Sequence, residues 1–196
     1  MSKRIASGLK SLILDVKVGH GSFNSTIEIS RELSQSLVSV ATGAGLKCEA
    51  IITDMNQVLG KSAGHTLEML ECIKYLKNEI KDYRLEKITN ELISSLLMMV
   101  HKISKEDALK KIEQVLSNGA AAEKFEKMTS ALGGPKNILS TYETDLHNES
   151  TARDIFSDKE GWIEKIHTRE LGLILIELGG GRKQVSDKIN YGVGYD

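Results

Sequence analysis

Lys3 is the first residue of the 196-residue sequence whose type and position suit chemistry. It stands near the start of a short segment expected to be helical, where the partial positive charge of a helix start adds to that of its ammonium group. An ammonium group can donate to a carbonyl or phosphate oxygen. Most lysines, however, are simply solvated on protein surfaces, and position alone favours that interpretation.

A second polar group follows, in which Asp15 and Lys17 precede His20. Residues 15 and 17 would point to the same face of a strand, because side chains alternate along a strand. The group then forms either an acid–base site at the end of the strand or an ordinary ion pair. The sequence leaves both interpretations open.

A third group begins with the run Asp54-Met55-Asn56-Gln57 and continues to Glu68 and Glu71. Carboxylate and amide oxygens around a loop are suitable ligands for a hard cation such as K⁺ or Ca²⁺. The alternative is that Asp54 or Asn56 caps a helix, and this is the interpretation that the residues alone favour.

A fourth group, Gly179-Gly180-Gly181-Arg182-Lys183, resembles a phosphate-binding loop but lacks the full GxxxxGK[ST] or GxGxxG pattern. A glycine cap at the end of a helix explains it adequately. The five histidines show no HExxH-like spacing, and no Ser/His/Asp order stands out, which argues against a metalloenzyme or a serine hydrolase.

These residues need elements to position them, and hydrophobic periodicity predicts strands followed by helices. An aliphatic run predicts a first strand that ends at a Gly-His-Gly turn, and a helix then begins with an N-cap at Ser25 or Thr26 and stops at Gly43 and Gly45. The carboxyl end of a second strand would deliver the Asp54 run, at the place where open α/β sheets bind ligands. In chain order we expect strands over Ser11–Val18 and Cys48–Thr53, and helices over Thr66–Lys77, Leu85–Lys102, Ser104–Ser117 and Ala120–Leu132.

The last quarter of the chain differs in pattern. Residues Asn148–Asp154 resemble a polar connection, Gly161–Thr168 alternates like a strand, and Arg169–Leu178 fits a helix. We therefore expect a boundary near residue 155 between two domains, 1–154 and 155–196. The ending, 190–196, has a turn-like sequence with no closing element.

Composition restricts the class of protein. The net charge of −1 provides no long-range field for a polyanion, so nucleic acid and a membrane surface are disfavoured as partners. No signal peptide or membrane-spanning stretch is expected, which predicts a cytoplasmic protein. Cys48 and Cys72 fit neither a metal motif nor a disulfide framework, and we interpret both as small core residues.

The segment SKRIASGLKSLILDVKVGHGSF, Ser2–Phe23, resembles the signature of the pyrimidine nucleoside phosphorylase family, SKKxAxGxxxLVxDVKxGxGAF. The likeness continues through TGAGLKCEAIITDMNQVLGKSAGHTLE, Thr42–Glu68, and through HTRELG, His167–Gly172, with GGGRKQVSDKINYGVG after it. It covers essentially the whole chain and is greatest for the thymidine phosphorylase type. The DVKVG and TDMNQ segments argue against a related phosphoribosyltransferase.

This resemblance implies an α/β fold with a sheet flanked by helices, the nucleoside phosphorylase type II central domain, followed by the start of an α+β C-terminal domain. It implies pentosyl transfer, in which phosphate cleaves thymidine or deoxyuridine to the base and 2-deoxy-α-D-ribose 1-phosphate, in pyrimidine nucleoside salvage. Lys3 aligns with the family lysine that binds a pyrimidine carbonyl. No cofactor is required.

The resemblance also implies a structural K⁺ or Ca²⁺ site in relatives that bind such a cation. The ligands there are main-chain carbonyls of a loop and a glutamate of the next helix, which correspond to Leu59, Ser62 and Glu71. A serine stands at 62 where the family more usually has alanine, and a carbonyl ligand does not depend on the side chain.

The family's phosphate-binding KxSTGG segment does not occur in this sequence, nor does the family's amino-terminal helical domain, which supplies much of its homodimer interface. We therefore expect no catalytic residue beyond the base contact of Lys3 and negligible turnover by this chain alone. The alternative is a noncatalytic remnant, or one half of a split enzyme that associates with a chain carrying the phosphate loop.

Overall fold

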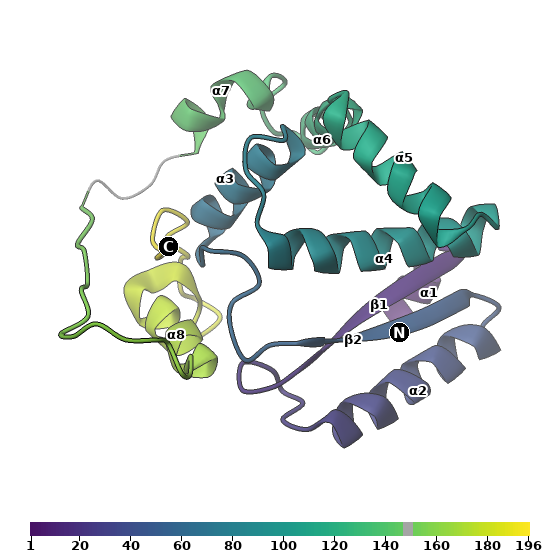
Figure 1. Cartoon of the computed structure of the whole chain (residues 1–196), viewed down its shortest axis with the longest axis horizontal. Helices are drawn as coiled ribbons and strands as arrows, with labels where there is room; N and C mark the ends of the chain where they lie inside the picture. The colour runs from purple at the N-terminus through teal and green to yellow at the C-terminus, as the bar shows by residue number, and fades with distance from the viewer. Residues whose placement is uncertain (147–150) are drawn as a thin grey trace. The chain divides into compact units, whose positions relative to one another are not determined.

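A computed structural model describes residues 1–146 and 151–196, which form two compact units (Figure 1). One unit contains residues 1–59 and 82–115, and the other contains 60–81 and 116–196. The domain boundary expected near residue 155 falls within the second unit and stays a prediction. The elements in chain order are α1 (Ser2–Ala6), β1 (Ser11–Val18), α2 (Ile27–Gly43), β2 (Lys47–Asp54), α3 (His65–Leu76), α4 (Tyr83–His101), α5 (Lys105–Ser117), α6 (Ala120–Ala131), α7 (Ile138–Asp145), α8 (Thr168–Leu175) and a π-helical turn (Ile176–Gly180).

The first unit is built on a parallel pair of strands, β1 and β2, joined through α2. The pairing runs the full length of both strands, from Ser11 opposite Lys47 to Val18 opposite Asp54. Both predicted strands are thereby confirmed. The carboxyl ends of the strands coincide, so the residues that follow Val18 and Asp54 emerge at the same end of the sheet.

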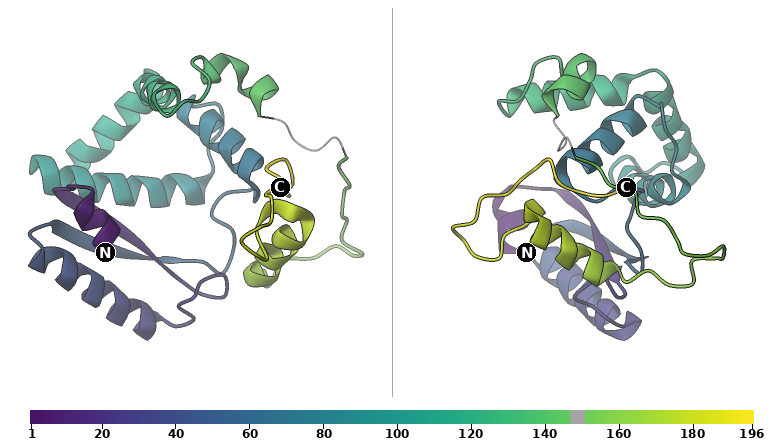
Figure 2. Two further views of the ribbon diagram at one scale, coloured as in Figure 1. Left: turned by 180° about the vertical axis from the view of Figure 1, so that it is seen from behind. Right: turned by 90° about the vertical axis from the view of Figure 1, so that its left-hand side faces the viewer.

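Helices cover both faces of this small sheet, with α2 on one side and α4 on the other (Figures 1 and 2). Leu12 and Val16 of β1 are buried between the layers. Burial on both faces is what a parallel sheet requires. The expected class, an α/β fold with a sheet flanked by helices, is confirmed at this level for the first unit.

The face of α2 that is buried is made of small residues. Ser30, Ser34 and Ala41 are buried, whereas Ile29 and Leu33 are 46% and 39% exposed. The helix begins where the sequence predicts, since the Thr26 hydroxyl caps it by accepting from the Ile29 N–H at 3.4 Å. The apolar spacing therefore predicts the helix correctly but not the face that it buries.

The second unit has its core where α3, α6 and α7 meet. Ile73, Ile138 and Tyr142 are buried together, and Leu70, Phe125, Leu139 and Leu146 pack against them. The α7 helix was not expected from the sequence. The Lys77 ammonium lies 4.7 Å from the centre of the Tyr142 ring and 2.6 Å from the Glu79 carboxylate, so a cation–π contact and an ion pair border this core.

The carboxyl-terminal residues are fastened to the start of α3. Ala63 and Tyr195 form an antiparallel bridge, with N–H to carbonyl distances of 2.8 and 2.9 Å. A Cβ atom on Gly64 would lie 2.5 Å from the Val193 carbonyl oxygen, and one on Gly194 would lie 2.4 Å from the Ala63 oxygen. Residues 190–196 form no helix or strand, as expected from their turn-like sequence, and two glycines allow the backbones to approach at this single bridge.

The strand expected over Gly161–Thr168 is absent, because residues 161–167 have no regular secondary structure and α8 begins at Thr168. A strand requires a neighbour for its backbone hydrogen bonds, and no β-pairing of the described residues includes this segment. The helix expected over Arg169–Leu178 is present as α8 and the π-helical turn. Of the expected connection Asn148–Asp154, residues 148–150 lie outside the described residues.

Cys72 is exposed on α3 and Cys48 is half-buried, so neither belongs to a core. Desolvation raises the pKa of the Cys72 thiol, and the carboxylates of Glu71 and Glu68 raise it further. This thiol therefore stays protonated at neutral pH. Among residues 1–146 and 151–196, no helix is long and apolar enough to cross a membrane.

The Asp82 carboxylate caps α4 by accepting from the Leu85 N–H at 2.8 Å. We expect Asp82→Ala to lower the free energy of unfolding by about 1 kcal/mol, because it leaves this N–H without its acceptor. Asp82→Ser keeps a capping oxygen and is the control. Urea unfolding followed by circular dichroism measures both variants, and equal losses would show that the cap is not the cause.

Candidate functional site

Asp15, Lys17 and Thr53 form a closed polar network on one face of the sheet. The Lys17 ammonium lies 2.7 Å from Asp15 Oδ2 and donates to Thr53 Oγ1 at 2.9 Å, and the Thr53 hydroxyl donates to Asp15 Oδ1 at 2.5 Å. The register explains the meeting, since Lys17 pairs with Thr53 across the strands. Of the two interpretations of Asp15 and Lys17, the structure shows the ion pair.

The turn after β1 is held by Asn56, which follows β2. Asn56 Oδ1 accepts from the His20 N–H at 2.9 Å. Gly19 has a φ of +124°, and a Cβ atom there would lie 2.7 Å from Asn56 Oδ1. The turn thus requires glycine for its backbone angle and for the close approach. Gly21 also donates, to the Met55 carbonyl at 2.9 Å.

Asp54 is bound by Arg84, a residue that the sequence did not single out. Arg84 Nη1 lies 3.3 Å from Asp54 Oδ2, and Nη2 donates to the Asp54 carbonyl at 2.5 Å. Asp54 also accepts from the Asn56 N–H and side-chain amide, at 3.2 and 2.5 Å. No helix begins at Asp54 or Asn56, so the expected helix cap is wrong: these side chains brace a loop against the start of α4.

Lys3 is exposed on α1, a helix of five residues that starts at Ser2. The helix ends after five residues, because the Ser7 hydroxyl donates to the Arg4 carbonyl and Gly8 turns the chain with a φ of +71°. The ammonium group of Lys3 is thereby presented to solvent a few residues before the sheet. It is therefore available to a ligand.

The loop that precedes α3 holds the Glu71 carboxylate by two hydrogen bonds, which we call the Glu71 grip. Oε1 accepts from the Lys61 N–H at 2.9 Å, and Oε2 accepts from the Ser62 hydroxyl at 3.0 Å. A Cβ atom on Gly60 would lie 2.3 Å from Oε2. Two of the three expected cation ligands, Ser62 and Glu71, are therefore together, and Leu59 directly precedes the loop in sequence. Glu68 is exposed and is not part of this grip.

Each carboxylate oxygen of Glu71 retains lone pairs beyond the one hydrogen bond that it accepts, so the donor set suits a hard cation. Ser62 is buried, which limits competition from water at this loop. The two neutral donors already compensate part of the carboxylate charge. The residues thus fit K⁺ or Ca²⁺ in type.

The Gly179-Gly180-Gly181 run ends the helical segment rather than cradling a phosphate. Gly179 has a φ of +94° where the π-helical turn stops. The next N–H groups, those of Gln184 and Lys183, donate to the Asp187 carboxylate at 3.0 Å each and hold its pKa below the ordinary value. The protein's own carboxylate occupies these donors, which supports the helix-end interpretation.

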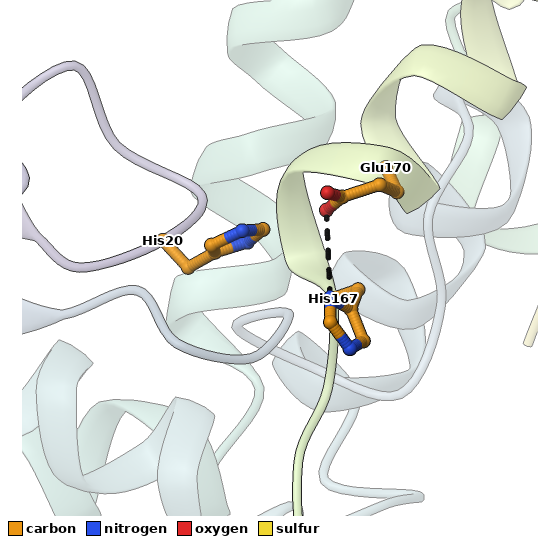
Figure 3. Close-up of side chains that lie close together, drawn as sticks. All are labelled: His20, His167 and Glu170. Carbon is orange, nitrogen blue, oxygen red and sulfur yellow. Dashed lines mark ion pairs between the residues drawn. The ribbon is translucent and has the colours of Figure 1, made fainter.

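His167 and Glu170 lie on the first turn of α8, with Nδ1 and Oε2 4.0 Å apart (Figure 3). Their spacing of three residues places them on one side of the helix. An ion pair forms only when the imidazole is protonated, and both side chains are more than half exposed. Such a pair contributes little to stability.

Comparison with known proteins shows two likenesses. Residues 162–196 match the pyrimidine nucleoside phosphorylase C-terminal domain. The chain is 43% identical over 197 aligned positions, 100% of its length, to a thymidine phosphorylase of Colwellia psychrerythraea. The chain is therefore similar to a member of the pyrimidine nucleoside phosphorylase family along its whole length. It spans 45% of the length of that relative.

The polar groups described above differ in how completely their hydrogen bonds are satisfied. The Asp15 network and the Gly19 turn satisfy the polar atoms named above, as structural groups do. In the Arg84 contact, Nε is buried without a hydrogen-bond partner among the described residues. Lys3 and the Glu71 carboxylate retain capacity for a ligand. The resemblance predicted both Lys3 and Glu71 as site residues. No feature of the sequence predicted Arg84, because no periodic spacing relates residues 54 and 84.

Gly60→Ala tests the Glu71 grip. The new methyl group would displace the carboxylate from the Lys61 N–H and the Ser62 hydroxyl, and we expect a loss of about 2 kcal/mol in the free energy of unfolding. Gly43→Ala is a matched control, because a Cβ atom there meets nothing within 4 Å. Denaturant unfolding compares them, and a loss no greater than that of the control would contradict the grip.

Proposed function

We propose that this chain serves the phosphorolysis of thymidine and deoxyuridine, a pentosyl transfer to phosphate that yields the base and 2-deoxy-α-D-ribose 1-phosphate. The observation that carries the proposal is the 43% identity with a thymidine phosphorylase along the entire chain. The reaction is reversible and belongs to pyrimidine nucleoside salvage in the cytoplasm. Within the chain we assign 1–154 to the type II central domain and 155–196 to the C-terminal α+β domain.

We assign binding of the pyrimidine base to Lys3. Negative charge develops on the base as its bond to the sugar breaks, and a cation near a carbonyl oxygen of the base stabilises that charge. The exposed ammonium group on α1 is free to donate in this way. The contact stabilises the transition state more than the ground state, so it accelerates the reaction as well as binding the nucleoside.

The phosphate nucleophile needs a site of its own. Donors from a KxSTGG segment would orient it on the opposite face of the sugar, and that segment is not in this sequence. We therefore propose that the 196-residue chain by itself has negligible activity. The second candidate is that it works noncatalytically or as one half of a split enzyme.

The assay follows phosphate-dependent release of thymine from thymidine. We expect none above background from the chain alone, and we expect activity when it is mixed with a polypeptide that carries the helical domain and KxSTGG segment of a thymidine phosphorylase. In the active mixture, Lys3→Ala should lower kcat/KM about 100-fold, because the charge on the departing base loses its cation.

Lys10→Ala is the matched control, since Lys10 is exposed in the same segment and has no assigned role. It should leave kcat/KM unchanged. Turnover by the chain alone would refute the requirement for a separate phosphate site. Equal effects of Lys3→Ala and Lys10→Ala would refute the role given to Lys3.

We also propose a structural K⁺ or Ca²⁺ held by Glu71 with the carbonyls of Leu59 and Ser62. The grip of the loop on the Glu71 carboxylate supports this, since it keeps an anionic oxygen beside a buried serine. Hard cations prefer such oxygen ligands. The cation would stabilise the fold and would take no part in the reaction.

Thermal unfolding in KCl, CaCl₂ and NaCl of equal ionic strength tests this site. A cation at 100 times its dissociation constant should add about 2.7 kcal/mol of stability, so K⁺ or Ca²⁺ should raise Tm relative to Na⁺. Glu71→Gln should abolish the difference, whereas Glu68→Gln, one turn earlier on α3 and exposed, should preserve it. An unchanged difference in Glu71→Gln would exclude the site.

A further inference from the structure

The segment Tyr191–Tyr195, here called the strap, lies beside the start of α3, next to the loop that contains Ser62 (Figure 1). Backbone hydrogen bonds hold it there. The Tyr191 carbonyl accepts from the Thr66 N–H at 3.1 Å, and Ala63 exchanges two hydrogen bonds with Tyr195, at 2.8 and 2.9 Å. The strap therefore binds the chain directly after Ser62, whose carbonyl group we propose as a cation ligand.

The strap fits against the chain so closely that two glycines are required. A Cβ atom on Gly194 would lie 2.4 Å from the Ala63 carbonyl oxygen and 2.6 Å from Leu67 Cδ1. Gly64 has a φ of +133°, and a Cβ atom there would lie 2.5 Å from the Val193 carbonyl oxygen. Side chains are thus excluded on both sides of this contact. A single added methyl group should therefore open it.

The hydrogen bond at Ala63 fixes the direction of the Ser62 carbonyl group. The Ser62 carbonyl and the Ala63 N–H belong to one planar, trans peptide unit, so the two bonds point in opposite directions. Because the Ala63 N–H donates to the Tyr195 carbonyl at 2.8 Å, the Ser62 carbonyl points away from the strap. Without that hydrogen bond the peptide unit could turn. The strap thus sets the orientation of a proposed cation ligand.

The Glu71 grip restrains the same short stretch from its other side. The Lys61 N–H and the Ser62 hydroxyl donate to the two oxygens of the Glu71 carboxylate, at 2.9 and 3.0 Å. Residues 61–63 are therefore held at one end by α3 and at the other by the strap. Ser62 is buried, so water does not readily replace either contact. Opening of one contact frees backbone angles that the other contact needs.

We propose that the strap is a latch that keeps the loop closed on Glu71. Its pairing with Ala63 holds residues 61–63 in the conformation of the Glu71 grip and directs the Ser62 carbonyl. The consequence for the ligand rests on the cation site proposed above. Coupling between two sites is reciprocal, so a closed strap raises the affinity of the loop for K⁺ or Ca²⁺, and the bound cation keeps the strap closed.

Amide hydrogen exchange of the isotopically labelled chain, followed by NMR in NaCl, tests the latch without the cation. Gly194→Ala should open the strap, and we expect the Ala63 and Lys61 amides to exchange about tenfold faster. The Lys61 amide is the informative one, because its acceptor is Glu71 and not the strap. Gly161→Ala is the matched control, since a Cβ atom there meets nothing within 4 Å, and it should leave both rates unchanged.

A milder variant carries the test if Gly194→Ala does not fold. The Tyr191 ring meets the His65 ring edge-on, with centroids 5.2 Å apart. Tyr191→Ala removes this contact and leaves the backbone free to pair, so we expect a smaller acceleration at the same two amides, Ala63 and Lys61. Circular dichroism verifies that each variant keeps its helices.

The cation should act through the same latch. In the wild type, KCl or CaCl₂ in place of NaCl should slow exchange of the Ala63 amide about tenfold, and Glu71→Gln should remove this slowing. Gly194→Ala should also reduce the rise in Tm that K⁺ or Ca²⁺ produces, whereas Gly161→Ala should preserve it.

The results separate the latch from the cation site. Faster exchange at Ala63 with unchanged exchange at Lys61 would overturn the latch, even where K⁺ or Ca²⁺ still raises Tm. If neither cation raises Tm in the wild type but both amides are accelerated in Gly194→Ala, the cation site fails and the coupling of the strap to the Glu71 grip stands.

Discussion

The parallel pairing of β1 with β2 is the constraint on which the first unit depends. Its register sets Lys17 beside Thr53 and brings the turn after Val18 next to the loop after Asp54. Every contact that shapes this end of the sheet follows from that alignment, including the hydrogen bond from His20 to Asn56. A slip of one residue would turn the apolar side chains of β1 to the opposite face and separate Asp15 and Lys17 from Thr53.

Parallel strands cannot be joined by a tight turn, and here α2 makes the connection. Its buried serines and alanine let the helix lie close to the sheet, which explains why its larger residues, such as Ile29, point away. The ion pair of Asp15 and Lys17 is half-buried within this arrangement. Removing one member would leave the other with a partly buried charge, so the pair is better understood as a fixed structural group than as a reactive one.

Local patterns predicted most of this fold, and contacts between distant residues account for what they missed. The spacing of Asp15 and Lys17 predicts their shared face, and Thr26 predicts the start of α2. Nothing local marks Arg84 as the partner of Asp54, because thirty residues separate them and no period connects a loop to a later helix. The approach of Gly64 to the carboxyl-terminal residues is likewise a contact between distant residues that no local pattern predicts.

The two candidate ligand-binding residues, Glu71 and Lys3, differ in the contacts that they make within the chain. Glu71 meets Ser62 because the loop before α3 lies against the second turn of that helix, and the resemblance alone pointed to these residues. Lys3 is the opposite case, because its short helix presents an exposed charge that is not held by another side chain in any contact described above. Catalysis by such a cation depends on holding both reactants in place, since orientation contributes as much as charge. In the proposed function, Lys3 would account for recognition of the base, and turnover would also require groups that fix the phosphate opposite to it.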